Sequence, residues 1–121
     1  MQQRGLRGAT TIENDTQENV LFATRELLDA ILASNPDLKT ADIASVLFTV
    51  TGDIVSAYPA LAARQMGWDH VPMMCAREIP VAGSLPLCIR VLVHWNTDHP
   101  QHQIKHVYLR GAIQLRPDLT K

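Results

Sequence analysis

This 121-residue sequence lacks the features that mark several common protein classes. Its two cysteines, Cys75 and Cys88, are too few for a disulfide framework, which favours a cytoplasmic protein with reduced thiols. No apolar run approaches the roughly 20 residues of a membrane helix, and polar residues follow Met1 where a secretory signal would be apolar. The formal net charge of -1 gives no electrostatic reason to expect nucleic acid or an anionic membrane as a partner.

The motifs of common cofactor and nucleophile sites are also missing. The sequence contains no G-x-G-x-x-G, no P-loop and no G-x-S-x-G motif. His99, His102 and His106 have spacings that metal ligands could have, but no cysteine pair or acidic triad accompanies them. We therefore expect these histidines to lie in solvated loops, and we expect an activity that uses neither metal nor cofactor.

We expect residues 1–121 to form a single domain, because this length suits one hydrophobic core. A long amphipathic helix is predicted after a start signal at residues 15–18, where Asp15 supplies a capping carboxylate, and it stops at residues 35–37. A short helix is predicted between Pro59 and Gly67. The predicted strands cover residues 4–12, 45–51, 71–78, 88–97 and 106–110, and a helical turn is predicted over residues 111–115.

These elements predict an α+β fold, in which a mixed five-stranded sheet is packed by the long helix and the short helix. Gly5 and Gly8 in the first strand indicate places where another element approaches the backbone closely. In residues 88–97, Arg90 projects from a mixed face, whereas the opposite face carries Ile89, Val91, Val93 and Trp95. No helix layer is predicted for the mixed face, so we expect another subunit to cover it.

Eight of the eleven basic residues are arginines. The planar fork of a guanidinium binds a carboxylate through two hydrogen bonds and keeps its charge near neutral pH. A single arginine is more often part of a surface ion pair, and composition bias would also explain the excess. Several near the ends of separate strands indicate a site for a small polyanion, formed from Arg7, Arg64, Arg90, Arg116, Glu78, Tyr108 and Cys75.

Four blocks of the sequence resemble the monofunctional, trimeric chorismate mutases of the AroH class. They are RGLRGATT at residues 4–11, CIRV at 88–91, QIKHVYL at 103–109 and LRPDL at 115–119. The resemblance implies a homotrimer whose sheets surround a pseudo-α/β-barrel, with active sites between subunits. It also implies the rearrangement of chorismate to prephenate in the shikimate pathway, without metal or cofactor.

The resemblance implies a role for each site residue. Arg7 and Tyr108 would hold the carboxylate of the enolpyruvyl arm, and Arg90 would place a cation against the ether oxygen. Glu78 would accept a hydrogen bond from the ring hydroxyl, which Cys75 would also contact. Further substrate contacts are implied at Tyr58, Arg64, Met74, Leu115 and Arg116.

The sequence departs from the family pattern at Leu61, Met74 and Tyr58, which affects substrate affinity and the rim more than the reaction. Cys75 and Glu78 are an odd number of residues apart, so they share one site only if the chain bends or bulges between them. Two alternatives remain open at this point. One is an enamine/imine deaminase-like trimer of similar architecture, and the other is a non-catalytic sensor of a shikimate-pathway ligand.

Overall fold

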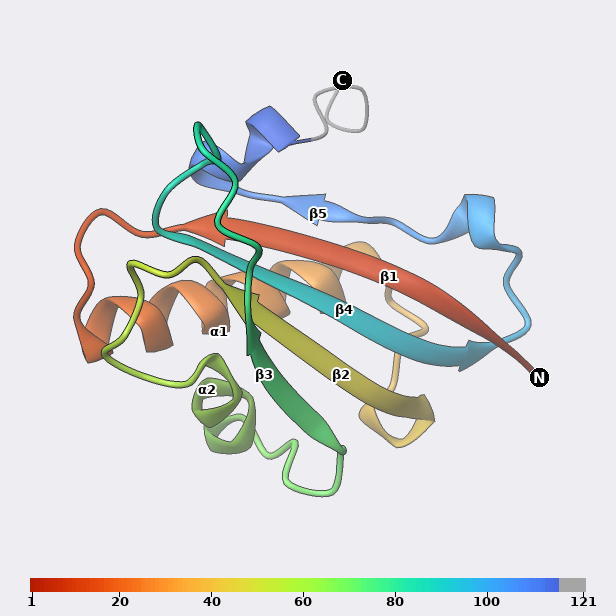
Figure 1. Cartoon of the computed structure of the whole chain (residues 1–121). Helices are drawn as coiled ribbons and strands as arrows, with labels where there is room; N and C mark the ends of the chain where they lie inside the picture. Colours follow the sequence, from red (N-terminus) through yellow and green to blue (C-terminus); the bar gives the residue numbers. More distant parts are fainter. Residues whose placement is uncertain (116–121) are drawn as a thin grey trace.

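The computed structural model describes residues 1–115 and contains one five-stranded sheet with two α-helices on one face (Figure 1). This arrangement confirms the predicted α+β fold. The strands are β1 (Gln2–Thr11), β2 (Ile43–Val50), β3 (Met73–Arg77), β4 (Cys88–Thr97) and β5 (Val107–Tyr108). The helices are α1 (Gln17–Ser34) and α2 (Pro59–Gln65), with short 3₁₀ segments η1 (Thr40–Asp42), η2 (Gln101–Gln103) and η3 (Arg110–Leu115). In this part of the chain, no helix combines the length and apolar character needed to cross a membrane.

The sheet has the strand order β3-β2-β4-β1-β5, so β4 is the central strand. Strand β4 pairs antiparallel with β1 along its whole length, from Thr97 opposite Gln2 to Cys88 opposite Thr11. It also pairs antiparallel with β2, whereas the β2–β3 and β1–β5 pairs are parallel. The sheet is therefore mixed, and its two edges are formed by β3 and β5.

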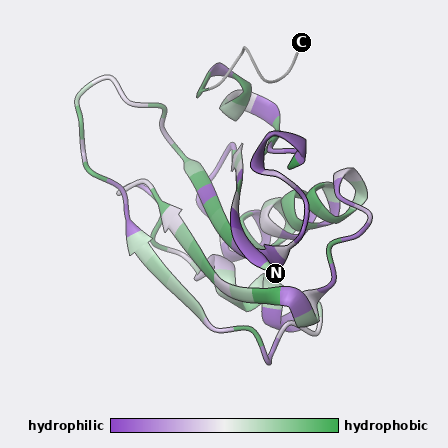
Figure 2. Cartoon of the chain, turned by 90° about the vertical axis from the view of Figure 1, so that its right-hand side faces the viewer, coloured by the Kyte–Doolittle hydropathy of each residue, from purple (hydrophilic) through white to green (hydrophobic). Residues whose placement is uncertain are grey.

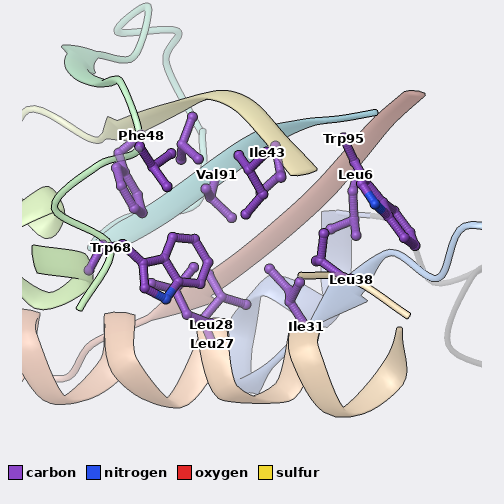
Figure 3. Close-up of a cluster of buried hydrophobic side chains, with 14 of the residues drawn as sticks. Leu6, Leu27, Leu28, Ile31, Leu38, Ile43, Phe48, Trp68, Val91 and Trp95 are labelled. Atoms are coloured by element: carbon purple, nitrogen blue, oxygen red, sulfur yellow. The ribbon is translucent and has the colours of Figure 1, made fainter. Parts of the chain in front are cut away.

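The hydrophobic core lies between α1 and one face of the sheet (Figure 3). Leu27, Leu28 and Ile31 of α1 are fully buried and pack with Leu6 and Val91 of the sheet. Burial of each such side chain contributes about 1.5–3 kcal/mol to folding. Val91, Val93 and Trp95 of β4 point into this core and Ile89 into a second apolar cluster on the same face, as the alternation of the sequence predicts.

The opposite face of the sheet, which we call the open face, carries both polar and apolar side chains. Figure 2 shows the helices on one side of the sheet only. Arg90, Leu92 and His94 of β4 project from the open face and are half-buried in the single chain. Thr49 of β2 lies opposite Arg90 on the same face. The alternation in the sequence thus placed Arg90 on the correct face.

The start of α1 differs from the prediction. Thr16 is the N-cap, and its hydroxyl accepts a hydrogen bond from the Asn19 amide at 3.1 Å. The predicted capping role of Asp15 is wrong, because its carboxylate instead accepts hydrogen bonds from Val55 and Ser56 in the loop before α2. These amides are 40 residues distant or more, so local sequence could not reveal them.

Two strands are shorter than predicted, and the histidines are not simply solvated. The predicted strands 71–78 and 106–110 contract to β3 and β5, which are edge strands paired on one side only. His106 lies before β5, and its Nδ1 accepts a hydrogen bond from the Arg7 amide at 3.0 Å. His99 Nε2 lies 2.9 Å from the carboxylate of Asp37. Both rings therefore have tertiary roles that their loop positions did not indicate.

Gly8 permits the close approach of α1 to β1, as its position in the strand predicts. A Cβ atom at Gly8 would lie 2.9 Å from Cδ1 of Ile31, 3.1 Å from Cγ1 of Val91 and 3.2 Å from Cδ1 of Leu27. These three side chains belong to the densely packed core, where added volume forces several neighbours to shift together.

We expect Gly8→Ala to lower the free energy of unfolding by about 1–3 kcal/mol, because the new methyl group overpacks this contact. The matched control is Gly5→Ala, whose Cβ would meet only Cδ1 of Leu92, at 3.8 Å, and whose effect should stay within about 0.5 kcal/mol. Urea unfolding at one fixed protein concentration measures both variants. Equal stability of the two would contradict the close packing at Gly8.

Candidate active site

One row of residues crosses the open face through all five strands. Strand pairing places Ala76 beside Thr49, Thr49 beside Arg90, Arg90 beside Ala9, and Ala9 beside Tyr108. Residues paired in this way project from the same face of a sheet, with Cβ atoms of direct neighbours about 5 Å apart. The row therefore brings Arg90 and Tyr108 to one side of the sheet, with only the small side chain of Ala9 between them.

Arg7 lies in the adjacent row of the same face. It pairs with Leu92, which is two residues along β4 from Arg90. Because its amide donates to Nδ1 of His106, the backbone of Arg7 is tied to the segment that leads into β5. Arg7, Arg90 and Tyr108 thus come from three neighbouring strands, and they share one face.

Glu78 reaches Arg90 from the opposite direction. Its amide donates to the carbonyl oxygen of Val50 at 2.9 Å, one residue beyond the end of β3. Its carboxylate lies over β2, where Oε2 accepts a hydrogen bond from the Thr49 hydroxyl and lies 3.7 Å from Nε of Arg90. The side chains of Arg90 and Glu78 are 31% and 23% exposed, so the pair is only partly screened by solvent.

Two buried donors in this region have no hydrogen-bond partner among the described residues. They are Nε of Arg90 and the hydroxyl of Tyr108. A buried donor left unpaired costs about 1–3 kcal/mol, and more when the group is charged. Two such donors in one row of a rigid sheet are therefore suited to binding the oxygen atoms of an anionic ligand.

Cys88 is a further neighbour of Arg90. Burial raises the pKa of the Cys88 thiol, and the nearby Arg90 guanidinium opposes that increase only in part. The raised pKa keeps the sulfur neutral near pH 7, so it does not compensate the charge of Arg90. Glu78 is the carboxylate that forms an ion pair with Arg90 in the described part of the chain.

A second cluster of candidate residues surrounds α2 and β3. Tyr58, Arg64, Met74 and Cys75 line a cavity of about 260 Å³ together with Ala60 and Met73. A larger groove of about 560 Å³ shares Tyr58 and Cys75 with this cavity. Tyr58 is 70% and Met74 is 71% exposed in the single chain. This second cluster is therefore an open surface at the β3 edge of the sheet.

The open-face residues and the second cluster are suited to binding a small, polarised anion, and less suited to nucleophilic catalysis or to binding a metal. A guanidinium and a carboxylate lie 3.7 Å apart, on the same face of the sheet as a buried tyrosine hydroxyl two strands from the guanidinium. Within residues 1–115, no three histidine, cysteine, aspartate or glutamate side chains are grouped as metal ligands would be. Opposite charges held on a rigid sheet can stabilise charge separation in a reacting molecule.

Comparison with known proteins identifies the family. Residues 3–119 match the family described as chorismate mutase type I. The chain is 57% identical to chorismate mutase AroH of Thermus thermophilus over 116 residues, which are 96% of this chain and 95% of that protein. It is 46% identical to chorismate mutase AroH of Bacillus subtilis (strain 168) over 118 residues, or 97% and 92% of the two chains.

A solved structure agrees with this result. The chorismate mutase from Clostridium thermocellum matches 89% of this chain with 96% of its own, at a TM-score of 0.87 and 48% identity. The chain belongs to the type I chorismate mutases. It is therefore an isomerase that converts chorismate to prephenate in the biosynthesis of aromatic amino acids. The resemblance noted in the sequence is confirmed, and a deaminase or a non-catalytic sensor is not supported.

The structure divides the predicted site residues into two groups within one chain. Arg7, Glu78, Arg90 and Tyr108 lie on the open face, and Leu115 packs beside the buried cluster that contains Tyr108. Cys75 instead packs against the core on the helix side of β3, on the opposite face from the Thr49–Glu78 contact. Tyr58, Arg64 and Met74 stay with Cys75 in the second cluster, and Arg116 lies outside the described residues.

Sequence reasoning missed three residues that support this region, namely Thr49, Cys88 and Asp15. Alternation along β2 places Thr49 on the mixed face, but only the register with β4 places it beside Arg90. Cys88 follows the same alternation as Arg90, and this was the available signal for it. Nothing local connects Asp15 with the loop that it holds.

Asp15 fixes the loop that leads to Tyr58. Its carboxylate accepts hydrogen bonds from the Ser56 hydroxyl at 2.6 Å and from the Val55 amide at 3.0 Å. These bonds, the Ser56 hydroxyl first, lower the pKa of Asp15 below its ordinary value of 3.8. Val55 and Ser56 both line the larger groove, so Asp15 shapes the groove without facing it.

We expect Asp15→Asn to lower stability at pH 7 and to lose this effect in acid. Because the pKa of Asp15 is lower in the folded than in the unfolded state, the stabilisation is fully present above the ordinary value of 3.8 and is lost as the pH falls through the folded value. Thermal midpoints of the variant and the parent at pH 7, 5 and 3 test this, with the exposed Asp69→Asn as control. A difference between Asp15→Asn and the parent that persists unchanged at pH 3 would refute the ionised contact.

Proposed function

We propose that Arg90 is the main catalytic cation of this mutase and that it acts on the ether oxygen of chorismate. The rearrangement lengthens the ether C–O bond, so negative charge accumulates on that oxygen and positive charge on the ring. The observation that carries the proposal is the buried Nε of Arg90, which has no hydrogen-bond partner in the described chain. A donor prepared in this way stabilises the transition state more than the ground state.

Glu78 has the complementary role in this proposal. Its carboxylate accepts the hydrogen bond of the ring hydroxyl and faces the positive charge that develops on the ring. Support comes from the position of its carboxylate, which lies 3.7 Å from Nε of Arg90 on the open face, so that both charges can face one bound ligand. A polarised transition state bound over this pair is stabilised at both of its charged ends.

Arg7 and Tyr108 bind the carboxylate of the enolpyruvyl arm in this proposal. Both lie on the open face beside Arg90, and the Tyr108 hydroxyl is buried without a partner among residues 1–115. Binding the arm over the ring holds the reactive conformer, and such positioning can contribute several kcal/mol, up to about 7–11, to lowering a barrier. Arg64 and Tyr58 belong to the rim, together with Met74, Cys75, Leu115 and Arg116.

We further propose that the active enzyme is a homotrimer with its sites between subunits. The rim residues lie at the β3 edge, whereas Tyr108 lies on β5 at the other edge, four strand spacings or about 19 Å distant. One molecule of chorismate cannot span that distance, so a neighbouring subunit would bring the second cluster to the open face. The exposed Tyr58, Met74, Ile79 and Val81 near β3 support such an interface.

A cytoplasmic location fits this proposal. Cys75 and Cys88 are both free thiols, which suits a reducing compartment.

We expect Arg90→Ala to lower kcat by at least 100-fold, because a preorganised donor in such a site contributes about 3 kcal/mol or more. Arg64→Ala should lower kcat less than about tenfold, since Arg64 is exposed and its charge is screened by solvent. The assay follows the loss of the diene absorbance of chorismate under saturating and limiting substrate. Similar losses of kcat in the two variants would contradict the assigned roles.

A mixing experiment tests the shared site. Arg90→Ala inactivates the half of the site that lies on the open face. Arg64→Glu inactivates the second cluster, because the reversed charge repels the two carboxylates of chorismate. If sites form between subunits, refolding an equal mixture should restore about one quarter of the parent activity, the fraction of interfaces that pair two intact halves. Light scattering should give the mass of three chains. Activity no higher than the mean of the two separate variants would rule out shared sites.

A further inference from the structure

The polar contact closest to the Arg90–Glu78 ion pair is made by an uncharged residue, Thr49. Thr49 lies in β2, directly between the two, because it pairs with Arg90 on β4 and with Ala76 on β3. Its neighbours Phe48 and Val50 pack into the cores on the helix side, so its own side chain is held on the open face. The hydroxyl of Thr49 donates to Oε2 of Glu78, the oxygen that also faces Arg90.

Glu78 needs such a contact, because its backbone lies just beyond the end of a short edge strand. One amide hydrogen bond, to Val50, fixes the main chain at Glu78, and the chain then leaves the sheet at Ile79. A glutamate side chain has three rotatable bonds, and fixing them costs about 1.5–2 kcal/mol in side-chain entropy. The ion pair with Arg90, at 3.7 Å through Nε, is too long to be a hydrogen bond and leaves the orientation of the carboxylate undetermined.

From this geometry we infer that Thr49 is a positioning residue for the rearrangement. Its hydroxyl binds one oxygen of the Glu78 carboxylate and so fixes the orientation of that carboxylate toward the substrate. The same hydrogen bond fixes the distance between the carboxylate and Arg90. Thr49 need not touch the substrate. The inference rests on the role proposed above for Glu78, because a fixed carboxylate matters only if that carboxylate acts.

The hydrogen bond from Thr49 to Glu78 explains why Arg90 and Glu78 do not form a closer ion pair. A glutamate free to rotate beside Arg90 could form a two-point ion pair, which would occupy the guanidinium donors that the substrate needs. The hydrogen bond from Thr49 holds Oε2 on the β2 side of the pair, and Nε of Arg90 remains without a hydrogen-bond partner among residues 1–115. Thr49 therefore preserves the donor capacity of Arg90 as well as the position of Glu78.

The test compares Thr49→Val, which keeps the shape and removes the hydroxyl, with Thr49→Ser, which keeps the hydroxyl. We expect Thr49→Val to lower kcat/KM about tenfold, mostly through kcat, which is the effect of losing one hydrogen bond to a charged group. Thr49→Ser should restore activity to within about threefold of the parent, because the donor is retained. The matched control is Ser45→Ala, which removes a hydroxyl contact to His94 on the same strand and face and should leave kcat unchanged.

A double-mutant cycle with Glu78→Gln separates this inference from the function on which it rests. In the Glu78→Gln background, Thr49→Val should cost far less than it does alone, because the carboxylate it positions is gone. If Glu78→Gln is impaired but Thr49→Val is as active as the parent, the inference is wrong while the proposed role of Glu78 stands. If the losses of activity in Thr49→Val and Glu78→Gln are fully additive, or if Thr49→Ser is no more active than Thr49→Val, then Thr49 has only a structural role and the inference is wrong. Parent-level activity of Glu78→Gln would overturn both.

Discussion

The register of the central strand β4 is the constraint on which this site depends. Its antiparallel ladders with β1 and β2 place Thr49, Arg90 and Ala9 in one line, and the parallel pairs at the two edges extend the line to Ala76 and Tyr108. A shift of one residue in either ladder would turn these side chains to the other face. The core beneath the sheet prevents such a shift, because it requires the apolar positions of the strands to face the helices.

The same rigidity accounts for the electrostatic character of the site. Nε of Arg90 is buried without a hydrogen-bond partner among residues 1–115, and the well-packed core on the other face of the sheet offsets this cost in a marginally stable fold. Catalysis of a rearrangement needs no proton transfer or covalent bond to the enzyme. In the mechanism that we propose, charges that are already oriented before the substrate arrives supply a large share of the acceleration, because they need no reorganisation during the reaction.

The edges of the sheet explain why one chain presents two separated groups. The β3 edge carries the exposed rim around Tyr58 and Arg64, and the β5 edge carries Tyr108 beside η3. Since α1 and α2 cover only the other face (Figure 2), Arg90 stays half-buried on the open face of the single chain, whereas Ala9 and Tyr108 are buried there beside η3. In the trimer that we propose, a symmetric assembly that joins unlike edges would cover the apolar surface and complete the site.

Much of this protein follows from the sequence alone. The period of the apolar residues predicted the long helix and the face from which Arg90 projects, whereas Pro59 and Gly67 predicted the short helix; all of these signals depend only on local geometry. The four motif blocks identified the family and proposed the site residues. Only the tertiary structure decided that Thr49 lies between Arg90 and Glu78, that Asp15 holds the loop before Tyr58, and that Cys75 lies on the other face from Glu78. The first two contacts join chain segments 29 and 40 residues apart, and all three features depend on strand register or tertiary packing, neither of which is encoded in the period of a single element.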